Sequence, residues 1–301
     1  MRLHGLMPPT ASSPTLPQTL DDAVAGRPAR LFDLLARGSG LPGPRPHLAL
    51  ADVFAQACRG RGAAADATIL RMARLSADEA PGATALEFLP VCGVAALGAR
   101  AAADATVRAR FVDELHAHAD DTRFRVRDAV VDALARVGGA VGERLALDLD
   151  SWMDGYFHAA AVVRGVGREA WLSAMREAGP AIARLDDAFT LAGDAPRAAA
   201  RYPGYKALRE ALTETPVALA ARFGVPVFDA LLRGPADDRT RRESLERLAE
   251  STRLAGRYSS EVERVRRALA ASRPSPRNPD HDVGPTRDRS RDRRLRGRGP
   301  K

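Results

Sequence analysis

Residues 120–139 read DDTRFRVRDAVVDALARVGG, and this stretch indicates the fold of the chain. Apolar side chains recur in it every three or four residues, the spacing that places them on one face of an α-helix. The apolar positions are Val126, Val130, Ala133, Leu134 and Val137. Acidic and hydroxyl residues at 120–122 are typical of a helix start, and the Gly138-Gly139 pair is typical of a helix end. We therefore predict a helix over residues 123–137.

A second amphipathic segment precedes this helix. Its apolar stripe consists of Val107, Phe111, Leu115 and His118. Only a few residues separate the two segments, so we expect them to pack as an antiparallel helix hairpin. A hairpin with one apolar stripe cannot bury that stripe alone, and its neighbours must therefore stack against it.

The composition favours helices throughout. The chain of 301 residues is 45% hydrophobic but only 5% aromatic. The runs of β-branched and aromatic residues that mark strands are nearly absent. We predict an all-α fold of stacked antiparallel helix hairpins, in which Pro90 kinks or splits the helix that contains it. The further helices are expected at 29–37, 47–58, 64–75, 84–98, 156–166, 168–178, 186–192, 204–213 and 216–222, from Pro226 onward, and around 245–252 and 262–269.

The stretch around residue 126 resembles the second helix of a HEAT repeat. The positions that carry the resemblance are Asp121, Val126, Arg127, Ala133, Leu134 and Gly138. Residues 94–98 look like a degenerate copy, and residues 160–163 with Gly167 look like another. The resemblance implies a HEAT-like α-α superhelix of irregular repeats. It also implies structural roles for Asp121 and Arg127, in capping and in polar ladders between repeats.

The two ends of the chain differ in composition from its body. Residues 1–20 are rich in Pro, Ser and Thr, and we expect a flexible N-terminal arm. Residues 21–271 are expected to form the HEAT-like helical repeat domain. Residues 272–301 contain five prolines and no aromatic residue, which predicts a disordered Arg-rich tail. This tail has ten basic and four acidic side chains, so it holds six of the eight net positive charges of the chain.

The charge of the tail suggests a ligand. Its guanidinium groups would neutralise the phosphates of a nucleic acid, and such binding would weaken steeply with salt. The alternative is a solvated tail that aids solubility. The tail positions concerned are Arg287, Arg289, Arg291, Arg293, Arg294, Arg296 and Arg298.

The segment 152–158 gathers unusual residues in a chain poor in aromatics. It contains Trp152, Asp154, Tyr156 and His158. One interpretation is a bulky junction at which successive repeats pack. The other is a binding pocket on the concave face, because HEAT-like DNA alkylation-repair glycosylases use Trp, Asp and Arg on such a face. The nearly neutral body of the chain does not favour a DNA groove.

A basic-aromatic loop is the second candidate binding segment. It contains Tyr202, Tyr205 and Lys206. Such a loop can contact a partner or a phosphate group. The competing interpretation is a turn that precedes the helix starting near Lys206.

Signals for catalysis are weak. The sequence has no HExxH, Walker or GxSxG motif. His116 and His118 form an HxH pair, but residues two apart on a helix point to different faces, and we interpret both as partly exposed histidines near a helix end. We predict no catalytic residue, no metal site and no cofactor.

These observations favour a non-enzymatic scaffold. We expect it to bind a protein or peptide partner on the concave face of the helical array. The alternatives are a nucleic-acid-binding protein, which could resemble those of DNA repair, and an enzyme supported only by residues 152–158. The most apolar stretch, residues 88–99, is too short to cross a bilayer, and the N-terminus has no apolar leader. The expected location is therefore the cytoplasm, and no membrane contact is predicted.

Overall fold

The computed structural model describes residues 15–234 and 238–272, and within them every regular element is helical. The prediction of an all-α fold is confirmed, because the described residues contain no strand. The α-helices are α1 (Leu16–Val24), α2 (Ala29–Gly38), α3 (Leu48–Arg61), α4 (Asp66–Ala73), α5 (Phe88–Ala103), α6 (Ala105–His118), α7 (Phe124–Val141), α8 (Glu143–Asp148), α9 (Tyr156–Val166), α10 (Glu169–Ala174), α11 (Gly179–Gly193), α12 (Pro203–Phe223), α13 (Val225–Arg233), α14 (Arg239–Glu250), α15 (Thr252–Arg257) and α16 (Ser259–Ala271). Short 3₁₀ helices occupy Gly62–Ala65, Ala85–Glu87, Asp150–Asp154 and Arg197–Arg201.

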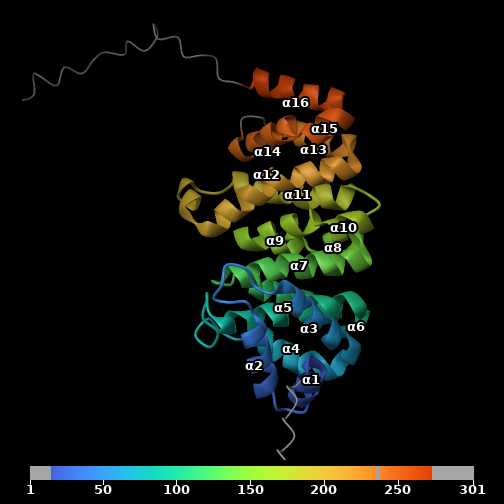
Figure 1. The fold of residues 1–301 in the computed structure, drawn as a ribbon. Helices are drawn as coiled ribbons and strands as arrows, with labels where there is room; N and C mark the ends of the chain where they lie inside the picture. Colours follow the sequence, from blue (N-terminus) through green and yellow to red (C-terminus); the bar gives the residue numbers. More distant parts are fainter. Residues whose placement is uncertain (1–14, 235–237, 273–301) are drawn as a thin grey trace, which may run out of the picture.

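The helices stack along one axis in the order of the sequence (Figure 1). One row runs through α5, α7, α9, α12, α14 and α16, and each member packs against the next. The helices that lie between them in sequence pack against this row: α6 on α5 and α7, α8 on α7, α11 on α9 and α12, and α13 on α12 and α16. The core is therefore a continuous seam between the two sets of helices.

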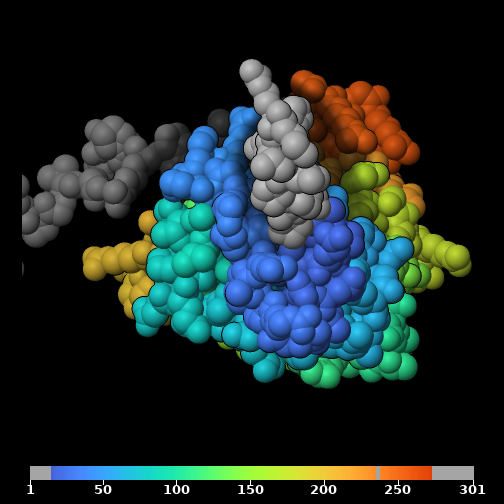
Figure 2. All heavy atoms as spheres, turned by 60° about the horizontal axis from the view of Figure 1, so that its bottom comes forward, coloured from blue at the N-terminus to red at the C-terminus, as the bar shows by residue number. Residues whose placement is uncertain are grey.

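The helices α1 to α4 cover the N-terminal end of the stack. They are the blue surface that faces the viewer in Figure 2. The helix α1 packs on α2, α3 and α4, while α2, α3 and α4 all pack on α5. These helices thus shield the first apolar face of the row from solvent, as terminal units of stacked helical arrays do.

The flexible N-terminal arm was predicted to be longer than the structure allows. The helix α1 begins at Leu16, within the range 1–20 that we expected to be flexible. Thr15 and Gln18 form a capping box, and Pro17 occupies the first turn, where proline fits. Leu20 is fully buried, so its side chain fixes the segment to the core. Residues 1–14 and the tail from 273 onward lie outside the described residues.

Glycines allow the closest helix contacts. A Cβ atom on Gly98 of α5 would lie 2.7 Å from the Cα of Ala133 in α7. A Cβ atom on Gly93 would lie 2.7 Å from the Cα of Ala73 in α4. Neither distance is compatible with a real side chain. The small residues of α5 therefore set its spacing from both neighbours.

Three predicted helix features were wrong. Pro90 does not kink a helix, because α5 begins at Phe88 and Pro90 falls in its first turn. The helix α7 does not end at Gly138-Gly139; it continues to Val141, and Gly142 with φ +62° follows it. The two helices expected at 204–213 and 216–222 form the single helix α12, which contains Pro216.

The segment Ala85–Ala103 is long and apolar enough to span a membrane by length and composition alone. However, 78% of its most apolar 18-residue window is buried inside the fold, as expected of a core helix. The apolar run at residues 88–99 is therefore part of a longer apolar segment than predicted, and its side chains are covered by neighbouring helices.

Candidate functional site

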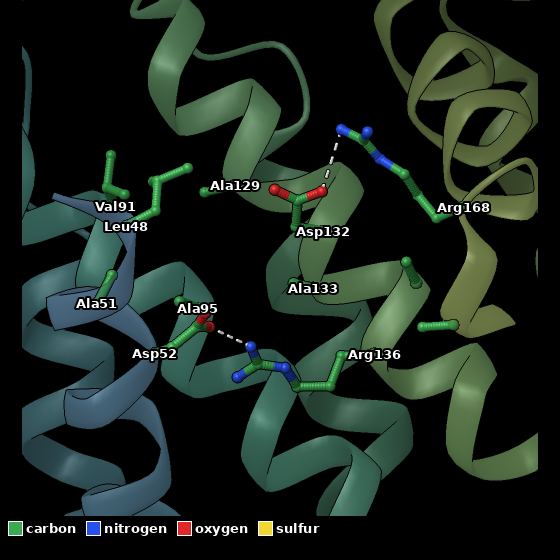
Figure 3. Close-up of a pocket in the computed structure, with 12 residues that line it drawn as sticks. Leu48, Ala51, Asp52, Val91, Ala95, Ala129, Asp132, Ala133, Arg136 and Arg168 are labelled. Atoms are coloured by element: carbon green, nitrogen blue, oxygen red, sulfur yellow. Dashed lines mark hydrogen bonds and ion pairs between the residues drawn. The ribbon is translucent and has the colours of Figure 1, made fainter. Parts of the chain in front are cut away.

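A shallow groove crosses the row of helices between α3, α5 and α7. Its cavity volume is about 420 Å³. The floor is made of small and apolar side chains: Leu48, Ala51, Val91, Ala95, Ala129 and Ala133. Figure 3 shows these side chains beside two pairs of charged residues. Because most floor positions are alanine, the helix backbones themselves shape the hollow.

Two ion pairs border this groove (Figure 3). Asp132 of α7 lies 3.1 Å from Arg168, which precedes α10, and Asp52 of α3 pairs with Arg136 of α7. Although the Asp132 side chain is exposed, crowding at the groove desolvates it and raises its pKa, and the charge of Arg168 opposes this effect only in part. The groove therefore presents an apolar floor with both signs of charge on its border.

Two smaller hollows lie along α7 near the groove. A smaller hollow shares Arg136 with it and is lined by residues of α3, α5 and α7. Another, of about 260 Å³, lies between α7, α9 and α12. On that side Asp128 of α7 pairs with Arg164 of α9 at 2.9 Å. A charged border thus runs along α7 and across its neighbouring helices.

The structure places Trp152 in the core. Only 2% of this residue is exposed, so its indole cannot contact a ligand on the surface. Tyr156 lies beside Tyr205 of α12, with ring centroids 5.4 Å apart at 76°. The two tyrosines were predicted as members of separate segments, and the fold brings them together. Trp152 is therefore a core residue, and Tyr156 of α9 contacts the next helix of the row.

The basic-aromatic loop leads into α12, as one interpretation predicted. Tyr202 immediately precedes the helix and is 60% exposed. Lys206 is exposed and lines the hollow between α7, α9 and α12. Tyr205 is half-buried, and its hydroxyl group donates to the carbonyl of Ala192 at 3.4 Å. Of the three predicted residues, Tyr202 and Lys206 are therefore exposed and Tyr205 is half-buried.

Asp154 and His158 meet a residue from another helix. The Nε2 atom of His116, in the last turn of α6, lies 3.2 Å from a carboxylate oxygen of Asp154. The imidazoles of His116 and His158 stack with centroids 3.9 Å apart and an interplanar angle of 18°. Their contact spans 42 positions of sequence, so no local pattern could have indicated it.

His116 and His118 point to different sides, as their spacing predicted, but His118 is buried rather than partly exposed. Its Nε2 atom lies 3.4 Å from Glu114. Burial lowers the pKa of His118 below 6.5, and the negative charges of Glu114 and Asp121 oppose this shift without cancelling it. His118 therefore binds a proton less readily in the folded chain than in the unfolded chain.

This lowered pKa predicts a pH dependence of stability. Above pH 6.5 the neutral His118 has no effect, and below it the free energy of unfolding should fall by up to about 1.4 kcal/mol per pH unit. His118→Gln should flatten this dependence below pH 6.5. Urea unfolding at a series of pH values measures it, with the exposed His47→Gln as the control. An unchanged slope in His118→Gln would contradict the assignment.

The positions that resemble a HEAT repeat have structural contacts. Val126, Leu134 and Gly138 are buried in α7. The Asp121 carboxylate accepts from the backbone N–H of Arg123 at 2.7 Å, so it caps the turn rather than the first helical residue. Arg127 donates to the carbonyl of Asp121 and lies over the ring of Phe157 at 4.3 Å.

The groove residues were missed by sequence reasoning, although one signal points to part of them. Asp128 and Asp132 are four residues apart on α7, and their partners Arg164 and Arg168 lie 36 residues further along. A matched pair of charges at a constant offset indicates that successive helices pack in register. The Arg side chains of the tail, from Arg287 to Arg298, lie outside the described residues.

A scan against protein-family models matched none, and searches of curated proteins and of solved structures returned no match. The geometry of the groove and of the His–Asp cluster is therefore the basis on which a function is proposed.

Proposed function

We propose that the chain is a HEAT-like scaffold that binds a peptide segment of a partner protein in the groove over α3, α5 and α7. The groove is the observation that carries the proposal. Its alanine floor leaves room for the side chains of a partner, and the hollow that shares Arg136 with it extends it along α7. Stacked helical arrays bind peptides along surfaces of this kind.

The HEAT-like assignment is supported by two features. Helices of one row pack in chain order, as repeats that contact only their neighbours do. The ion pairs Asp128–Arg164 and Asp132–Arg168 form a ladder at an offset of 36 residues, close to the length of a helix-pair repeat. Such ladders keep successive repeats in register.

The chemistry of the groove favours a peptide of mixed character. Apolar side chains of the peptide would cover the exposed part of the floor at Leu48 and Ala95, where burial is favourable by about 25 cal/mol per Å². Acidic and basic groups of the peptide would exchange with the exposed pairs Asp132–Arg168 and Asp52–Arg136, which contribute little to stability themselves.

A bulky side chain in the groove should weaken this binding. A peptide library selected on the full chain supplies the ligands, and their affinity is measured by fluorescence anisotropy. Ala95→Trp fills the floor and should weaken binding at least about tenfold, which corresponds to about 1.4 kcal/mol. The control is Ala117→Trp, an exposed position on α6, which should bind as the wild type does.

Three outcomes separate the candidate functions. Equal affinity in Ala95→Trp and Ala117→Trp would contradict the groove proposal. Binding that survives deletion of residues 273–301 is expected if the groove is the site. Loss of binding on that deletion, with a steep salt dependence for nucleic acid, would instead favour the alternative of a nucleic-acid-binding protein.

A further inference from the structure

We infer that His116, Asp154 and His158 form a binding site for a divalent first-row transition metal such as Zn²⁺. Each residue offers one ligand atom, and the three atoms all lie within 4.8 Å of one another. Imidazole nitrogen and carboxylate oxygen are the ligands that Zn²⁺ and its neighbours take in proteins. The site is separate from the groove and does not depend on its function.

The distances around Asp154 suit a shared ion. Its carboxylate lies 3.2 Å from Nε2 of His116 and 2.9 Å from Nδ1 of His158. Ligands about 2.1 Å from a tetrahedral Zn²⁺ lie about 3.4 Å from one another. Asp154 is therefore close to the position of a ligand relative to each nitrogen, and a small expansion would admit the ion.

His158 has a nitrogen without a hydrogen-bond partner. The Nδ1 atom is inaccessible to solvent, and although Asp154 is near, the angle between them does not suit a hydrogen bond. A buried polar atom in this state is destabilising by about 1–3 kcal/mol unless something satisfies it. Coordination of an ion through Nδ1 would satisfy it.

Gly155 leaves the space that this nitrogen needs. A Cβ atom at residue 155 would lie 2.7 Å from Nδ1 of His158. The backbone of Gly155 is extended, so any residue could adopt it, and the requirement is for space alone. The absence of a side chain at residue 155 thus allows the His158 ring to lie against this turn, beside Asp154.

The buried ring of Trp152 lies beside both imidazoles, and the site is open to solvent on one side. Trp152 lies edge-on to His116 at 5.0 Å and to His158 at 6.3 Å. The side chain of Asp154 is 53% exposed and that of His116 is 29% exposed, so the ion has a path from solvent. With three protein ligands, one position stays open for water, as in catalytic zinc sites.

Ion binding requires one ring to turn. The imidazoles are nearly parallel, at 18°, whereas the lone pairs of two rings that bind one ion must converge in their ring planes. The exposed side of His116 gives that ring room to rotate about its Cβ–Cγ bond. The stacked arrangement is then the metal-free form of the site.

Titration of the full chain with ZnSO₄ in a calorimeter tests the inference. We expect one ion per chain, and Co²⁺ should give the visible absorption of a four-coordinate complex. His116→Ala, Asp154→Asn and His158→Ala should each weaken binding at least about tenfold. The exposed His47→Ala should bind as the wild type does.

Folding effects can be separated from metal binding. Asp154 is mostly exposed, so Asp154→Asn keeps the shape and should unfold at the wild-type urea concentration without metal. Zn²⁺ should raise the melting temperature of the wild type but not of Asp154→Asn. Absence of one-to-one binding, or equal affinity in Asp154→Asn and His47→Ala, would overturn the inference.

Discussion

Replacing Arg123 with methionine should lower the free energy of unfolding by about 3–5 kcal/mol, because the change breaks a buried ion pair and leaves its partners unsatisfied. The Arg123 side chain is only 4% exposed. Its guanidinium group donates to the carboxylate of Asp121 at 2.6 Å and to three backbone carbonyls. The carbonyls belong to Leu75, Ser76 and Ala80, at 2.8, 3.1 and 3.0 Å.

These contacts join two loops that are distant in sequence. The carbonyls follow α4, and Arg123 precedes α7, so one side chain connects the start of the stack to its centre. Burial alone would raise the pKa of Asp121, but the hydrogen bonds and charge of Arg123 outweigh it and lower that pKa. The lowered pKa indicates that the pair is favourable in the folded chain.

Urea unfolding followed by circular dichroism measures the expected loss in Arg123→Met. The matched control is Arg144→Met, because Arg144 forms an exposed ion pair with Asp148 within one helix. Exposed pairs contribute about 0–1 kcal/mol, so the control should lose no more than that. A loss in Arg123→Met as small as that of Arg144→Met would show that Arg123 does not fix the two loops.

The sequence allowed the local structure to be predicted where one face of a helix is apolar. Phe111 and Leu115 of α6, and Val126 and Val130 of α7, are buried as their spacing predicted. The end of α7 was wrong because Gly138 was interpreted as a helix end. Instead, the absence of a side chain at Gly138 leaves space for the ring of Trp171, which is 33 residues away in sequence.

The candidate sites could be predicted only in part. The sequence indicated Asp154 and His158 as candidate binding residues. It did not connect His116 with them, because His116 was considered only together with His118, two residues away. The register between α6 and α9 decides which side chains meet, and that register is set by packing across the whole stack. The groove could not be predicted from the sequence for a related reason. Alanines on three helices form a hollow only when the helices are packed together.

The contact of Gly138 with Trp171 leads to the second prediction. The indole of Trp171 is fully buried and fits between Gly138 of α7 and Gly165 of α9. A Cβ atom at residue 165 would lie 3.3 Å from Cζ3 of Trp171, and one at residue 138 would overlap the indole. The indole N–H donates to the carbonyl of Gly142 at 3.0 Å, which fixes the ring in this position.

Trp171→Ala should lower the free energy of unfolding by about 3–5 kcal/mol, since it removes a large buried ring and leaves a cavity. Gly138→Ala should lower it by about 1–3 kcal/mol, because the added methyl group forces the ring or α7 to shift. Against a total stability of about 5–15 kcal/mol for a folded domain, either change is large. Urea unfolding of both variants measures these losses.

The double variant separates overpacking from any other effect of residue 138. In the Trp171→Ala background, the methyl group that Gly138→Ala adds has space, and replacing a glycine inside a helix by alanine should stabilise the chain by about 0.5–1 kcal/mol. The effect of Gly138→Ala should therefore change sign between the wild-type and Trp171→Ala backgrounds, which gives a coupling energy of about 1.5–4 kcal/mol when the two estimates are combined. Equal effects in both backgrounds would mean that Gly138 is needed for some reason other than the ring. A change of sign would establish that α7 needs a glycine at residue 138 because the ring of Trp171 occupies the space of a side chain there. The contact between Gly138 and Trp171 would then set the spacing between α7, α9 and α10.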